Sequence, residues 1–157
     1  MAGKTVARNR GEGTAYWMLG GLYEVKASGD ETGGKMTIVE MNIPAGMGPP
    51  QHTHPGGEAV YVIEGNVRYH IEDDTLEGGP GSFFYIPEGT WENFEPTSQV
   101  RLLVIYEPGG TEKFFAEAGE PASSHELPPP PEGDPDISGL LAAAEKYGMQ
   151  IRAPQEA

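Results

Sequence analysis

The chain has 157 residues and a formal net charge of −14, from 10 Lys and Arg against 24 Asp and Glu. So few cations argue against a nucleic-acid partner, whose phosphates need Lys and Arg in number, and against an anionic membrane surface. The chain has no cysteine, which excludes disulfides and thiolate chemistry. We see neither a leader-like apolar start nor a run of about 18 apolar residues, so we expect a cytoplasmic protein.

Composition and pattern divide the chain into four parts. We expect a flexible N-terminus over residues 1–13 and a β-barrel domain over 14–119. Residues 120–135 contain the run Pro128–Pro131 and are predicted to be an extended linker. Residues 136–157 are predicted to be a helix followed by a tail.

Short alternating segments separated by Gly- and Pro-rich turns predict an all-β sandwich or small barrel. The predicted strands cover residues 16–25, 35–43, 58–63, 67–71, 82–86 and 100–106. The turn Glu64-Gly65-Asn66 separates two of them, which predicts a hairpin between 58–63 and 67–71. The alternation also predicts that Glu58, Val60 and Val62 face the interior.

Two helices are predicted after the last strand. The first covers 111–118 and stops at Gly119. The second has Asp136 as its candidate N-cap and apolar residues at helical spacing up to Gly148. Because so short a helix is not stable alone, we expect it to dock on the barrel or on a second subunit.

The chemistry is concentrated in the segment His52-Thr53-His54, which is followed by Glu58. Two of the four histidines lie here. Two imidazoles and one carboxylate are donors that divalent metals accept, and the same set is found in non-haem iron oxygenases, where it leaves positions open for substrate and dioxygen. We therefore predict a metal site at His52, His54 and Glu58.

This segment resembles the first motif of the cupin superfamily. The spacing of that motif is matched by Gly46, His52, His54, Glu58 and Gly65. The second cupin motif is matched at Gly81, Pro87 and Gly89. It departs at two positions, where Glu92 replaces the expected histidine and Pro96 the expected asparagine. The resemblance implies a jelly-roll barrel (double-stranded β-helix) with a metal in its interior.

The flanking segments narrow the resemblance to quercetin 2,3-dioxygenase-like monocupins. Residues 16–22, the Phe114-Phe115 pair followed by Gly119–Pro121, and the Pro-rich linker are similar to that group. The resemblance implies a dioxygenase acting on a small aromatic, flavonol or polyketide-type substrate, with Fe, Mn or Ni as the metal and Zn as a further option. It implies that Glu58 is both ligand and base, and that the protein is a homodimer.

Glu92 leaves three hypotheses open. It is a fourth metal ligand beside His52, His54 and Glu58, or it is a catalytic acid or base beside a three-ligand metal, or it is exposed in a loop. A second anionic ligand would favour a harder metal such as Mn(II) or Fe(II). A buried carboxylate near another anion has a raised pKa, which suits proton transfer.

Two other functions remain open. The first is a non-oxidative isomerase, cyclase or lyase that uses the same metal and carboxylates. The second is a non-catalytic cupin that binds a small molecule. Weaker site candidates are Glu40, His70 and His125, for which a surface position is at least as good an interpretation. Four aromatic residues could line a pocket, although each is more simply explained by core packing: Trp17, Phe84, Trp91 and Phe94.

Overall fold

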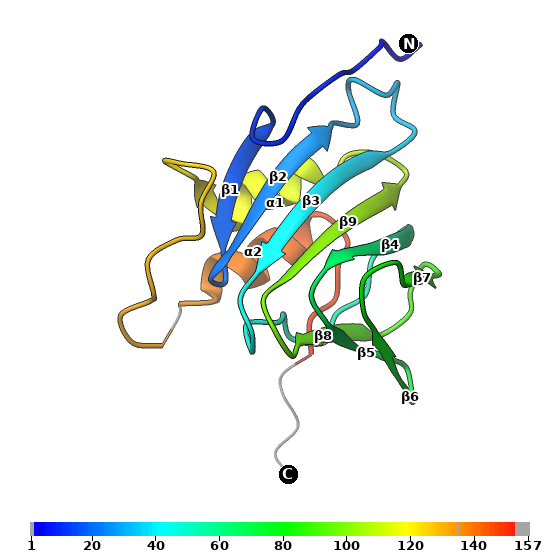
Figure 1. The fold of residues 1–157 in the computed structure, drawn as a ribbon. Coiled ribbons are helices and arrows are strands. Elements are labelled where there is room, and N and C mark those ends of the chain that lie inside the picture. Colours follow the sequence, from blue (N-terminus) through cyan, green and yellow to red (C-terminus); the bar gives the residue numbers. More distant parts are fainter. Residues whose placement is uncertain (1, 135, 153–157) are drawn as a thin grey trace.

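A computed structural model describes residues 2–134 and 136–152, and it consists of two antiparallel β-sheets that face each other (Figure 1). The larger sheet has the order β10-β1-β2-β3-β9-β4-β7 and the smaller one β6-β5-β8. This arrangement confirms the all-β barrel. The strands of the larger sheet are β1 (Thr14–Met18), β2 (Gly21–Ala27), β3 (Thr37–Ile43), β4 (Gly57–Glu64), β7 (Phe83–Ile86), β9 (Val100–Glu107) and β10 (Glu120–Pro121). Those of the smaller sheet are β5 (Val67–Ile71), β6 (Asp74–Gly78) and β8 (Glu92–Pro96).

The predicted hairpin between 58–63 and 67–71 is wrong. β4 pairs with β7 and β9, whereas β5 pairs with β6 and β8. The turn at Gly65, with a φ of 82°, therefore carries the chain from one sheet to the other. A turn signal between two strands does not distinguish a hairpin from a sheet-to-sheet crossing, because both need the same reversal of direction.

Three strands were not predicted: β6, β8 and the two-residue strand β10, which lies in the predicted linker and pairs with β1. β6 reads Asp-Thr-Leu-Glu-Gly, and four of its five residues are exposed, so it has no apolar alternation. β8 begins at Glu92 and ends at Pro96, residues that rarely mark a strand. β6 and β8 form because β5 offers a backbone edge on each side, which is a tertiary effect.

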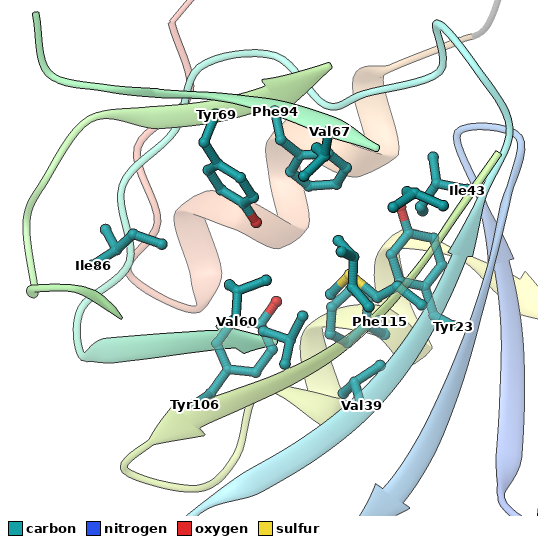
Figure 2. Packing of buried hydrophobic residues seen from close by; sticks show 14 of the residues in the cluster. Tyr23, Val39, Ile43, Val60, Val67, Tyr69, Ile86, Phe94, Tyr106 and Phe115 are labelled. Carbon is teal, nitrogen blue, oxygen red and sulfur yellow. The ribbon is translucent and has the colours of Figure 1, made fainter. Parts of the chain in front are cut away.

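The core lies between the sheets and follows the alternation of the strands. In β3, every second residue from Thr37 to Ile43 is buried, and β9 shows the same pattern. Glu58, Val60 and Val62 of β4 are buried while Tyr61 is exposed, which confirms the predicted orientation. Figure 2 shows side chains of both sheets meeting in this interior.

The two helices are α1 (Glu112–Ala118) and α2 (Ser138–Lys146), and both contribute to the core. Phe115 of α1 stacks on Tyr23 of β2, with ring centroids 5.1 Å apart. Leu140 of α2 is buried in the same core. Docking of the second helix on the barrel is therefore confirmed. The predicted N-cap is displaced by one residue: Ile137 is the N-cap, and Asp136 instead accepts hydrogen bonds from the backbone and hydroxyl of Ser138.

Residues 2–13 contain no helix or strand but contact the larger sheet. The Arg8 guanidinium donates to both carboxylate oxygens of Glu31, at 2.9 and 2.7 Å. The linker residue His125 approaches the carbonyl of Gly13 at 2.8 Å. Met1 and the tail predicted after Arg152 lie outside the described residues. Neither helix in the described part of the chain has the length and apolar character needed to cross a membrane.

Candidate metal centre

The backbones of His52 and Glu92 lie directly opposite each other. The N–H of each residue donates to the carbonyl oxygen of the other, both at 2.9 Å. Residues paired in this way project their side chains to the same face, about 5.5 Å apart at Cα. A further bond from the Gly89 N–H to the His54 carbonyl, at 2.9 Å, holds the turn before β8 against the histidine segment. The local fold thus brings Glu92 to the histidines.

Glu58 reaches the same place from a different element. It is the second residue of β4, which is paired on both sides, so that Glu58 lies opposite Ile86 of β7 and Tyr106 of β9. Side chains alternate along a strand, and Glu58 shares the inner face with Val60. Its carboxylate therefore enters the barrel from a strand whose backbone is fixed at both edges.

The four predicted site residues converge in the interior. One imidazole nitrogen each of His52 and His54 and one carboxylate oxygen of Glu92 all lie within 4.8 Å of one another. His52 Nε2 is 3.7 Å from Glu92 Oε1, and His54 Nε2 is 3.2 Å from Glu58 Oε2. The two imidazole rings meet edge to face, with centroids 4.8 Å apart. The hypothesis that Glu92 is exposed in a loop is therefore wrong.

A hydrogen bond sets the tautomer of His52. Its Nδ1 lies 2.9 Å from the carbonyl oxygen of Pro50, which can only accept, so Nδ1 carries the proton. The lone pair of Nε2 then faces Glu92. A metal-binding histidine is commonly oriented in this way, by a backbone carbonyl on its second nitrogen.

Buried polar atoms at this site lack partners. The exposed fractions are 8% for each histidine, 3% for Glu58 and 1% for Glu92. Within the described part of the chain, His54 Nε2, Glu58 Oε2 and both carboxylate oxygens of Glu92 have no hydrogen-bond partner. Unpaired buried carboxylates cost several kcal/mol, on the order of the desolvation of an ion. A divalent cation would satisfy all these donors at once, so the residues fit a metal.

Burial also shifts the proton affinities of the site. It raises the pKa of Glu58 and Glu92, and the charge of Glu58 raises the pKa of Glu92 further. It lowers the pKa of His52, and it holds the pKa of His54 well below the usual histidine range. Neutral imidazoles are the form that binds a metal. A bound metal would also replace the proton that the pair of carboxyl groups, Glu58 and Glu92, retains without it.

The histidines and Glu58 form one end of an apolar cavity of about 50 Å³. Its wall comes from the larger sheet, from both helices and from the segments next to them. The lining residues are Met18, Leu19, Tyr23, Met41, Pro49, Pro50, His52, His54, Glu58, Phe94, Tyr106, Phe114, Phe115, Leu140, Met149 and Ile151. Such an enclosure, apolar with a few convergent polar groups, is typical of a small-molecule site.

The weaker polar candidates lie elsewhere. Glu40 and His125 line a separate pocket, which contains Arg10 and none of the four site residues. His70 lies on β5, where its Nδ1 approaches the Thr75 hydroxyl at 3.1 Å and its Nε2 approaches Glu95 at 3.4 Å. These positions agree with the surface interpretation.

Of the four aromatic candidates, only Phe94 lines the cavity. Phe84 packs on Tyr69 at 4.8 Å between centroids. The Trp91 ring lies 3.8 Å from the Arg152 guanidinium, and Trp17 donates from its indole to the backbone of the linker. Trp17, Phe84 and Trp91 are thus excluded from the cavity wall.

Several cavity residues were not predicted. Tyr23 and Tyr106 could have been predicted from the sequence, because each is at a buried position of its strand. Met149 and Ile151 follow α2, and their place in the cavity wall could not be predicted from the sequence. Ile151 forms a β-bridge with His52, a contact across about a hundred residues that no local pattern encodes.

Comparison with known families identifies the fold. Residues 39–106 match the family described as "Cupin domain". This range contains both motifs, from β3 to β9, and together with the two sheets it establishes an all-β cupin barrel. No protein among the curated sequences compared with this chain matches it.

Solved structures agree on the fold. An RmlC-like cupin from Shewanella frigidimarina is 15% identical, with a TM-score of 0.60 over 69% of this chain and 96% of that one. KdgF from Halomonas sp. is 17% identical, with a TM-score of 0.54 over 60% and 85%. Oxalate decarboxylase of Bacillus subtilis, a protein with Mn(II) centres, is 20% identical, with a TM-score of 0.57 over 69% of this chain and 32% of its own. The chain thus spans about a third of that enzyme.

Proposed function

We propose that this protein is a metal-dependent cupin oxygenase that acts on a small aromatic, flavonol-like or polyketide-type compound. The observation that supports it most is the cluster of His52, His54 and Glu92, whose ligand atoms lie within 4.8 Å of one another, next to an apolar cavity lined by both histidines and Glu58. Two imidazoles and two carboxylates suit Fe(II) or Mn(II), while Ni(II) and Zn(II) accept the same donors. The substrate class comes from the resemblance to quercetin 2,3-dioxygenase-like monocupins.

His52, His54, Glu58 and Glu92 would hold the ion. When bound, the ion supplies Lewis acidity and, if it is redox-active, electrons for dioxygen chemistry. The protein itself fixes the donors: His52 through the Pro50 carbonyl, and Glu58 through its place in β4. The rest of the cavity lining is mostly apolar, which lowers the local polarity around the reacting groups.

The second task of the carboxylates is to move a proton. Substrates of this class react as phenolates or enolates, so a base must accept a hydroxyl proton. Burial raises the pKa of both Glu58 and Glu92, which brings a carboxylate closer to the proton affinity that a general base needs near neutral pH. Glu58 lines the cavity, whereas Glu92 does not, so we assign the base to a Glu58 oxygen.

A non-oxidative isomerase, cyclase or lyase is the second candidate. The presence of Glu92 where the motif has a histidine favours it, because a second carboxylate adds base capacity without adding redox function. This candidate uses the same residues and needs no dioxygen. A cupin that binds a small molecule without converting it is the third.

Metal analysis followed by turnover tests distinguishes the three. The purified protein is analysed for bound metals, stripped, and reloaded separately with Fe(II), Mn(II), Ni(II) and Zn(II). Dioxygen consumption with a flavonol is then followed. We expect uptake with a redox-active metal and none with Zn(II). Conversion of substrate by the Zn(II)-loaded protein without dioxygen uptake would establish the non-oxidative candidate, and failure to bind any metal would refute all the metal-centred ones.

A further inference from the structure

The cavity wall carries no positive charge. Among the described residues that line it, none is Lys or Arg, and the ionisable groups are His52, His54, Glu58 and two tyrosines. A ligand carboxylate or phosphate would therefore meet no cation in this wall.

The metal itself would not compensate an added anion. A divalent ion with Glu58 and Glu92 as ligands has no net charge, since two carboxylates balance it. Any further negative charge would lie uncompensated in an apolar enclosure, where the cost of burying an ion is high. An uncharged ligand avoids this cost, because its apolar body gains free energy from burial against the same walls.

The cavity is too small for such a ligand as it stands. Its volume of about 50 Å³ compares with about 300–1,000 Å³ for sites that hold drug-sized molecules. Part of the wall has to move outward. The residues from β2, β3 and β9 cannot do so easily, because their strands are paired on both sides within the larger sheet.

The part of the wall that comes from α2 and the segment after it belongs to neither sheet. We define the C-terminal wall as Leu140 of α2 together with Met149 and Ile151. The segment after α2 is tied to the histidine segment by two backbone hydrogen bonds, Thr53 N–H to Gln150 and Arg152 N–H to Gln51, both 2.9 Å. The Gln150 N–H also donates to the Thr53 hydroxyl, at 3.2 Å.

We propose that the cavity selects an uncharged ligand with an apolar body, and that the C-terminal wall moves away from the histidine segment to admit it. The proposal rests on the proposed metal centre but not on oxygenase chemistry. It names Leu140, Met149 and Ile151 as the residues that set the size and polarity of the ligand. Acids are excluded as ligands.

A matched pair of probes tests the polarity. Acetophenone and its para-carboxylate share one carbonyl group that does not ionise near neutral pH, and they differ by a single charge at the far end. Calorimetry on the Zn(II)-loaded protein, in which no redox turnover consumes the probe, should show the neutral probe binding at least about tenfold more tightly. Equal affinities, or no binding of either probe, would overturn the proposal.

Two adjacent leucines provide the matched variants. Leu140 is 6% exposed and lines the cavity, whereas Leu141 is 43% exposed and does not line it. Leu140→Lys should strengthen binding of the carboxylate probe by about tenfold, because it brings a cation to the wall. Leu141→Lys adds the same charge to the same helix and should change the affinity for neither probe. Thermal unfolding of both variants checks that the fold is retained, and Met149→Lys is the second variant if Leu140→Lys does not fold.

An engineered disulfide tests whether the C-terminal wall moves. The chain has no cysteine, so Gln51→Cys with Arg152→Cys introduces one defined pair at residues already joined by a backbone hydrogen bond. Opposed residues of this kind lie about 5.5 Å apart at Cα, within the range of a disulfide. We expect the oxidised protein to bind the neutral probe at least about tenfold more weakly, with recovery on reduction. Unchanged binding after oxidation would show that this wall stays in place.

These experiments separate the two proposals. Zn(II) affinity, measured first, reports on the metal centre alone. If Zn(II) binds and the probes do not discriminate, the proposed ligand class is wrong while the metal centre stands. If Zn(II) does not bind, the proposed function fails before either probe is added.

Discussion

The two buried carboxylates of the site are held in different ways. Glu58 is on β4, which is paired with a strand on each side, and its oxygen lies 3.2 Å from His54. Glu92 begins β8, at the edge of the smaller sheet, and lies 3.7 Å from His52. The backbone of Glu92 is held by the very residue it faces. Glu58 is thus held between two strands of one sheet, whereas Glu92 is held between Ile71 of β5 and His52 of the histidine segment.

The largest expected effect is on metal affinity. Glu58→Ala and Glu92→Ala each remove one donor of four, and each should weaken metal binding by at least about 100-fold, more than is usual for residues that only support a ligand. Glu92→His restores the residue of the second cupin motif and should retain the metal. Competition with a chelator of known affinity measures all three.

Unchanged metal content in Glu92→Ala would show that Glu92 is not a ligand. The matched surface control is Glu95→Ala, also on β8, which removes a carboxylate that is exposed. A loss of metal in this control would mean that the strand, rather than the donor, was affected.

The next effect concerns the metal-free protein. Glu58 Oε2 and both carboxylate oxygens of Glu92 are buried without a hydrogen-bond partner, so Glu58→Gln and Glu92→Gln should each raise the free energy of unfolding, by about 1–4 kcal/mol. Glu92→Gln should give the larger increase, because both its oxygens lack partners while Glu58 has one such atom. Denaturant unfolding in the presence of a chelator measures this, and a decrease in either variant would contradict the desolvation argument.

The pH dependence of stability follows from the same groups. Burial raises the pKa of both carboxyls, so the folded metal-free protein retains a proton that the unfolded chain releases. Stability is then greatest at low pH and is lost as the pH rises through the folded-state values. The histidines, with lowered pKa, act oppositely, but only below their ordinary value of 6.5.

Above pH 6.5 the metal-free protein should therefore lose stability, by up to about 1.4 kcal/mol per pH unit for one proton. The metal-loaded protein should show a flat profile, because the ion has replaced the proton. Glu58→Gln and Glu92→Gln should both reduce the slope, because each removes one carboxyl of a coupled pair. A metal-free profile that rises with pH would refute the assignment.

The smallest effect on folding is expected at the outer edges of the two sheets. Tyr61, Phe83 and Tyr85 are 47%, 63% and 58% exposed where the larger sheet ends at β7. We propose that the protein is a homodimer and that this edge pairs with a second copy. Phe83→Asp should shift the protein toward the monomer in light scattering while changing unfolding by less than about 0.5 kcal/mol. Leu76→Asp, on the smaller sheet, should leave the dimer intact; the reverse result would place the interface there.

The local sequence pattern was enough to predict part of this structure. Spacing alone indicated that His52, His54 and Glu58 belong together, and alternation placed Glu58 on the inner face of β4. The local sequence pattern failed where contacts between distant segments determine the structure. β6 forms against β5 although its own residues are polar and exposed. The hairpin at Gly65 was wrong, because a turn does not reveal which sheet the next strand joins. Ile151 reaches the site through a β-bridge to His52, which no local pattern predicts.

The hydrogen bond between Arg152 and Gln51 has a practical consequence for handling the protein. Gln51 precedes His52, and Ala157, the last residue, is five positions after Arg152. A polyhistidine tag at the C-terminal end would introduce competing imidazoles in sequence after the segment that pairs with Gln51, and a measured metal content would then include the tag. The N-terminal segment is anchored instead at Glu31, through Lys4 and Arg8. Tags for metal analysis therefore belong at the N-terminus and should be removed before loading.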